Sequence, residues 1–143
     1  MKRSLFILLS LLPLLGAAQK SFTISGKLPV GKAPVKAYHN MMQNGKWQEV
    51  DSADIKNGIF SFTGNVEDPQ QAFLRIRYKG EEHLPSSRLK DVLMFYLESG
   101  TIHMASEDLI RNARITGSIV NQEAREFSEA RKDYEPANMR LAT

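Results

Sequence analysis

The sequence of 143 residues contains no cysteine and carries a formal net charge of +3. A chain of this length suits one domain with a modest core, and the lack of cysteine excludes disulfide bonds and thiol chemistry. Because Lys2 and Arg3 belong to an N-terminal leader, the remainder is close to neutral, which argues against a nucleic-acid-binding face.

The N-terminus has the three parts of a secretory signal peptide. A short basic start precedes the apolar run Leu5–Leu15, and small residues at positions 16–18 come directly before Gln19. The apolar run is shorter than the ~20 residues that a membrane-spanning helix needs. We therefore expect residues 1–18 to be cleaved, which leaves an exported chain without a transmembrane anchor.

Residues 19–117 are dominated by an alternation of apolar and polar side chains. Phe22, Ile24 and Leu28 share one side of the first run, and Phe60 and Phe62 repeat the pattern. Turn-forming residues interrupt the alternation regularly, as in small antiparallel proteins. We predict an all-β fold, a small antiparallel β-sandwich or barrel-like domain with one C-terminal α-helix. The expected strands cover residues 22–28, 35–39, 47–55, 59–66, 71–78, 92–97, 101–105 and 113–117.

Two of these strand predictions concern pairing and position. The runs 47–55 and 59–66 are joined through Asn57-Gly58, which favours a tight hairpin because both residues tolerate positive φ angles. Residues 41–46 are interpreted as a polar connection. The run Val92–Leu97 is apolar at every position, which predicts a central strand covered on both faces.

After residue 117 the spacing of apolar residues changes from the period of two that is typical of strands to the period of a helix. Ser118 is expected to cap a connector helix over residues 118–135, with Val120, Phe127 and Tyr134 on one face. Pro136 is expected to end the helix and residues 136–143 to fray. The apolar face is narrow, so it is a candidate partner surface, and a homodimer through this helix remains an alternative.

A second candidate partner surface is the basic stripe formed by Arg75, Arg77 and Lys79. A charged outer face usually keeps an exposed strand soluble, and contact with an acidic partner is the alternative. The three histidines lack the spacing of a metal site and are interpreted as surface or rim residues. Trp47 is interpreted as a packing residue, with a glycan-stacking platform as the alternative. No catalytic, metal or cofactor site is predicted.

Several phrases of the sequence resemble a known envelope domain. They include Asn57-Gly58 followed by Phe60, Phe62 and Gly64, and the phrases 95–102 and 115–118. The resemblance is to the N-terminal β-rich domain of unknown function that precedes the thioredoxin-like domain in exported proteins of the alkyl hydroperoxide reductase/thiol-specific antioxidant and thiol-disulfide interchange type. It covers residue 21 to about residue 134.

The resemblance implies a periplasmic location in a Gram-negative bacterium and a thioredoxin-like partner. In those relatives, the redox cysteines lie in a Cys-x-x-Cys motif of the following domain, and no residue here matches that motif. A natural stand-alone protein, a truncated product and a domain cut from a longer protein all fit this departure. We expect a non-catalytic accessory domain of an envelope thiol-disulfide system, and an independent exported β-sandwich that binds a glycan, peptide or other ligand is the alternative.

Overall fold

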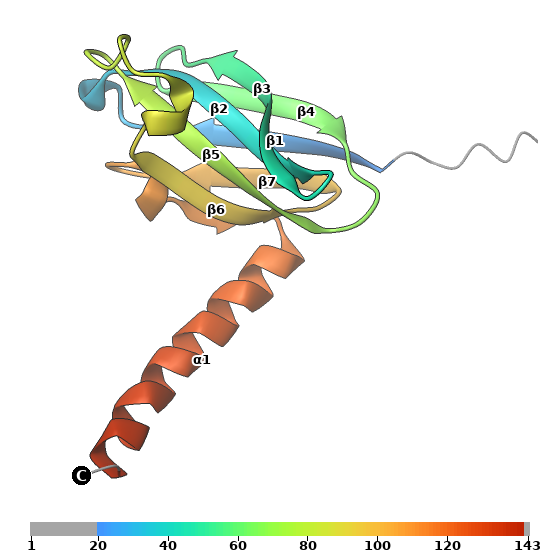
Figure 1. The fold of residues 1–143 in the computed structure, drawn as a ribbon, viewed down its shortest axis with the longest axis vertical. Helices are drawn as coiled ribbons and strands as arrows, with labels where there is room; N and C mark the ends of the chain where they lie inside the picture. The colour runs from blue at the N-terminus through green and yellow to red at the C-terminus, as the bar shows by residue number, and fades with distance from the viewer. Residues whose placement is uncertain (1–19, 142–143) are drawn as a thin grey trace, which may run out of the picture.

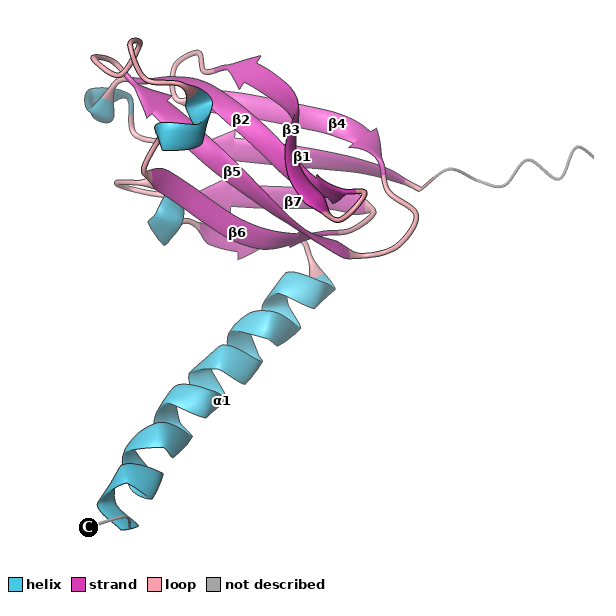
Figure 2. Ribbon diagram, in the orientation of Figure 1, coloured by secondary structure: helices cyan, strands magenta, loops and turns pink. Residues whose placement is uncertain are grey.

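The structure, a computed structural model, describes residues 20–141, with side chains described for residues 20–134. The expected signal peptide, residues 1–18, lies outside the described residues. Eight strands form two sheets of four, which face each other in a sandwich (Figure 1; Figure 2). The predicted all-β fold with one C-terminal helix is confirmed, and its form is a sandwich.

Each sheet combines segments from distant parts of the chain. Sheet I has the order β4 (Ile59–Asn65), β1 (Ser21–Lys27), β7 (Gly100–Ala105) and β8 (Arg114–Thr116). Sheet II has the order β3 (Lys46–Asp54), β2 (Pro34–Gln43), β5 (Gln70–Tyr78) and β6 (Asp91–Leu97). The 3-10 helices η1 (Val30–Lys32), η2 (Ser86–Arg88) and η3 (Ile110–Asn112) lie in the connections. All neighbouring strands are antiparallel except β1 and β7, which pair in parallel.

The core lies between the two sheets because each sheet turns one face toward the other, and the side chains on these facing surfaces are mostly apolar. The same period that predicts the strands therefore selects the buried residues. The core residues are Phe22, Ile24, Leu28, Ala37, Ile55, Phe60, Phe62, Val66, Ala72, Leu74, Ile76, Phe95, Leu97, Ile102, Met104 and Ile110.

Two glycines in sheet I make room for phenylalanine rings on the neighbouring strand. Gly26 lies opposite Phe60 in the β1–β4 register, and a Cβ built on Gly26 would meet the Phe60 ring at 2.0 Å. Gly64 lies opposite Phe22, whose ring a Cβ on Gly64 would meet at 2.8 Å. Both glycines therefore allow a close approach of a ring to the strand, and the rings cover glycine backbone that would otherwise lack a side chain to pack on it.

The predicted hairpin across Asn57-Gly58 is wrong. β3 and β4 belong to different sheets, and between them only Lys56 and Ile59 form an isolated antiparallel bridge. Asn57-Gly58 has the expected positive φ angles, but the turn acts as a corner that moves the chain from sheet II to sheet I. The Leu28 N–H donates to the Gly58 carbonyl at 2.8 Å, which fixes this corner against the end of β1.

The tight hairpin lies one turn earlier in the chain. β2 continues to Gln43, so the expected polar connection over residues 41–46 is also wrong, and β2 pairs with β3 through Asn44-Gly45. Both turn residues have positive φ angles, 51° and 75°. Asn-Gly therefore predicts the local turn correctly at both places, while the sheet to which the next strand goes depends on contacts from elsewhere.

β6 is an edge strand, which corrects the prediction that Val92–Leu97 is central. It pairs with β5 on one side only, and the strands inside sheet II are β2 and β5. Met94 is 51% exposed on its outer face. An all-apolar run predicts a buried strand, but it does not show whether the strand has a neighbouring strand on both sides or, like β6, on one side only.

A single long helix follows β8 and points away from the sandwich (Figure 1). α1 spans Ile119–Leu141, so the predicted end at Pro136 is wrong. A proline removes one intrahelical hydrogen bond, but a helix that already has several turns before the proline can continue beyond it. Among the residues that the structure describes, no helix has the length and apolar character required to cross a membrane.

Candidate functional site

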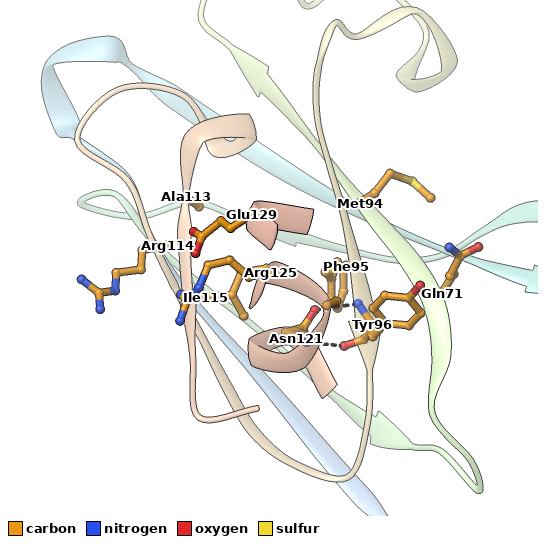
Figure 3. Close-up of a pocket in the computed structure, with 11 residues that line it drawn as sticks. Gln71, Met94, Phe95, Tyr96, Ala113, Arg114, Ile115, Asn121, Arg125 and Glu129 are labelled. Carbon is orange, nitrogen blue, oxygen red and sulfur yellow. Dashed lines mark hydrogen bonds between the residues drawn. The ribbon is translucent and has the colours of Figure 1, made fainter. Parts of the chain in front are cut away.

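A hollow in the described part of the chain follows the free side of β6, and a larger one, of about 1030 Å³, lies between Leu28 at the end of β1 and Ala105 at the end of β7. The hollow beside β6 is a groove of about 640 Å³ that β6, β8 and the first turns of α1 enclose (Figure 3). Met94 and Tyr96 form one wall, and Ile115 and Ala124 add apolar surface. Arg114, Arg125 and Glu129 supply the charged groups of its lining. The groove thus combines apolar walls with two guanidinium groups and one carboxylate.

Asn121 joins the helix to the edge of sheet II. The backbone N–H of Tyr96 donates to Asn121 Oδ1 at 2.8 Å, and Asn121 Nδ2 donates to the Tyr96 carbonyl at 2.7 Å (Figure 3). The side-chain amide presents one donor and one acceptor, as a peptide group does. Asn121 therefore occupies the place that the backbone of a further strand would take beside Tyr96.

Ser118 holds Asn121 in this position. Ser118 Oγ accepts hydrogen bonds from the Asn121 backbone N–H at 3.2 Å and from Asn121 Nδ2 at 2.7 Å. The first of these bonds is the N-cap interaction predicted from the sequence. The two hydrogen bonds between Asn121 and Tyr96 are called the latch below. Because Ser118 and Asn121 are both buried, the cap and the latch form one unit that fixes the start of α1 against β6.

The predicted apolar face of α1 is exposed along most of its described length. Phe127 is 73% exposed and Tyr134 is 67% exposed, whereas Val120, close to the sandwich, is half-buried. Residues seven apart lie on nearly the same side of a helix, so the three side chains form one stripe. This stripe, Val120, Phe127 and Tyr134, is called the α1 stripe below.

Two of the three residues in the basic stripe predicted on β5, Arg75 and Arg77, have a structural role. Arg75 donates to the Ser86 carbonyl at 3.3 Å, and Arg77 donates to the Leu84 carbonyl at 2.6 Å. Both guanidinium groups also lie over aromatic rings of the outer face of sheet II, at 4.8 and 5.1 Å. They thereby hold the loop before β6 against the sheet, while Lys79 lies beyond the strand and is exposed.

His39 is a core residue, which corrects its interpretation as a surface or rim histidine. It is 1% exposed, and its ring centroid lies 5.9, 5.5 and 6.3 Å from those of Phe22, Phe62 and Phe95. Its Nε2 has no hydrogen-bond partner among the described residues. Burial lowers the pKa of His39 from 6.5 to about 4, against an opposing effect of the Asp51 carboxylate.

The other two histidines, His83 and His103, are exposed as expected. Among the described residues, no group of three or more histidine, aspartate or glutamate side chains is placed to hold a metal ion. Trp47 packs on Phe73 with 4.8 Å between ring centroids and remains partly exposed at the edge of sheet II. This contact agrees with the packing role expected for it.

Asp91 is a buried carboxylate whose partners are all structural. It accepts hydrogen bonds from the Tyr78 hydroxyl, from the Ile110 N–H at 2.9 Å and from the Arg111 N–H at 3.1 Å. Arg111 also reaches it through Nε at 3.4 Å. Burial, reinforced by the bond to Asp91, raises the pKa of Tyr78. The carboxylate therefore attaches η3 to the start of β6.

Sequence reasoning missed the groove and the latch. Asn121 has no distinguishing neighbours in the sequence, and its role depends on the position of an edge strand that was predicted to be central. The signal that existed was Ser118 as a cap, since a cap fixes where the first turn of the helix begins.

The fold and the groove define a β-sandwich domain that carries a long helix at one end. Residues 22–124 match the family model of DUF4369, a domain of unknown function. Because this match covers well over half of the sequence, the chain belongs to the DUF4369 family. No curated protein and no solved structure shows significant similarity to this chain.

Proposed function

We propose that this chain is an exported, non-catalytic accessory domain of an envelope thiol-disulfide system. Its role is to position a thioredoxin-like partner or to help that partner select substrates, in the periplasm of a Gram-negative bacterium. The absence of cysteine from the sequence means that the reactive thiols come from the partner. The signal-peptide pattern of residues 1–18 and the resemblance described above support the location and the partner.

The α1 stripe is the observation that carries this proposal. A large aromatic side chain such as Phe127 loses favourable burial energy when it stays in water, about 2 kcal/mol relative to a packed position. The helix begins at a rigid point, since Asn121 and Ser118 fix its first turn. A rigid arm with an apolar side suits a domain that holds a second domain at a set place.

Two neighbouring substitutions on α1 test this role. Phe127→Glu places a charge in the stripe, whereas Ser128→Glu adds the same charge about 100° around the helix. Reduction of insulin by a thioredoxin-like domain is measured with and without each protein, together with binding by calorimetry. We expect the wild type and Ser128→Glu to bind and change the rate, and Phe127→Glu to lose both effects. Equal behaviour of the three proteins, or no effect of the wild type, would contradict the proposal.

The groove beside β6 favours a second candidate function, an independent exported module that binds a glycan, peptide or other ligand. Its support is a concave surface with apolar walls and a few polar groups, which is typical of ligand sites. The two functions differ in the residues that they use. Loss of partner binding with Phe127→Glu supports the accessory role, whereas ligand binding that is insensitive to this substitution supports the module.

A further inference from the structure

The free edge of β6 offers unpaired backbone groups inside the groove. In an antiparallel pair, the N–H and C=O groups of successive residues point alternately toward the partner strand and away from it. The Tyr96 groups point away from β5, because they bind Asn121. With the β5–β6 register unbroken, the groups of Met94 point the same way. Among the described residues, no hydrogen bond outside the strand ladders involves the Met94 N–H or C=O, and no second strand lies beside β6 on this side.

The groove has room for a chain at this position. One wall includes Met94, whose side chain is 51% exposed. The opposite wall includes β8, a strand of only three residues. Asn121 already shows that this edge accepts an amide group in the place of a neighbouring strand. A second amide, one rung further along β6, would meet the Met94 groups beside it.

We propose that the edge of β6 at Met94 pairs with an extended segment of another polypeptide, with the Asn121 amide as the adjoining rung. The main-chain hydrogen bonds give affinity in this mode of recognition, and the pockets for alternate side chains give specificity. The lining has two arginines, Arg114 and Arg125, against one carboxylate, Glu129. Figure 3 shows the Arg114 side chain pointing away from β6, so Arg125 is the arginine available to the segment. The segment that fits best carries an acidic side chain on the side that faces Arg125.

This surface is separate from the α1 stripe, and the inference rests on the second candidate function, ligand binding in the groove, and not on the accessory function. It needs only this chain and a peptide, so its outcome is independent of any thioredoxin-like protein. A random-peptide phage library is panned against the chain, and the recovered peptides are synthesised. Their binding is measured by calorimetry and by the backbone amide shifts of the isotope-labelled protein.

Substitutions at Met94 separate backbone pairing from side-chain contact. Met94→Pro removes the outward N–H, which β5 does not use, and we expect about a tenfold or larger loss of affinity. Met94→Leu keeps the N–H and an apolar side chain, and we expect its affinity to remain within about twofold of the wild type. Circular dichroism checks that both variants fold.

A further variant keeps the test decisive if Met94→Pro does not fold. Arg125→Glu reverses a charge on the exposed side of the groove and leaves the backbone of β6 untouched. We expect it to weaken binding of acidic peptides several-fold, with amide shifts in the wild type that centre on Met94. The proposal is overturned if no peptide is recovered, if the shifts centre elsewhere, or if sedimentation shows that β6 pairs with a second copy of this chain.

Discussion

The burial of His39 predicts that the domain loses stability as the pH falls below neutrality. Above pH 6.5 the histidine is neutral in both the folded and the unfolded chain. Between 6.5 and about 4 the unfolded chain binds a proton that the folded chain does not bind. The unfolded state is therefore favoured progressively as the pH decreases through this window.

The size of the effect follows from the two pKa values. A shift from 6.5 to about 4 corresponds to about 3 kcal/mol once the pH lies below both values. Between pH 7 and pH 5 the expected loss is about 2 kcal/mol. This is a large part of the stability of a small domain, and it applies with little screening because the ring is enclosed by three phenylalanines.

The measurement is urea unfolding, followed by circular dichroism, at a series of pH values. His39→Phe keeps an aromatic ring among its neighbours and removes the titrating group, so the wild-type curve minus the variant curve isolates the effect of His39. His103→Gln alters an exposed histidine and should keep the wild-type pH dependence. Parallel curves for the wild type and His39→Phe between pH 7 and pH 5 would refute the reasoning.

Three further perturbations test the packing of the sandwich and its helix. Asp91→Ala leaves buried donors without an acceptor and should lower the unfolding free energy by about 3 kcal/mol, whereas Asp54→Ala, at an exposed carboxylate, should cost under ~0.5 kcal/mol in the same urea titration. Gly26→Ala should cost about 2 kcal/mol of unfolding free energy because its Cβ meets the Phe60 ring. Together with Phe60→Leu, which removes the ring, it should cost less than the sum of the two single changes, and strictly additive costs would contradict the clash. Asn121→Ala should speed amide hydrogen exchange in the first turns of α1 while the sheets stay protected, and unchanged exchange there would argue against the latch.

The sequence predicts the strands well because burial of one face imposes a period of two. The positions of Phe22, Ile24, Phe60 and Phe62 in the core follow from that period alone. The Ser118 cap is also local, since it involves a side chain and a backbone group three residues apart. Features that a short window contains were accessible without the structure.

Pairing between strands is not local, and it is here that the sequence interpretation was wrong. Asn44-Gly45 and Asn57-Gly58 form turns with similar φ angles, yet one connects two strands of a sheet and the other changes sheets. The difference lies in contacts such as that between Leu28 and Gly58, which come from a distant strand. The candidate site depends on the same long-range arrangement, because Asn121 acquires its role only when β6 is an edge.

The parallel pairing of β1 with β7 has a consequence for how the domain is made. β1 contains the first residues of the sandwich, but its second neighbour lies some seventy residues or more downstream, at Gly100–Ala105. Until that segment has left the ribosome, β1 offers one bare edge to other nascent chains. High contact order of this kind slows folding, so a holding chaperone has time to act and a product shortened before residue 100 would be prone to aggregate.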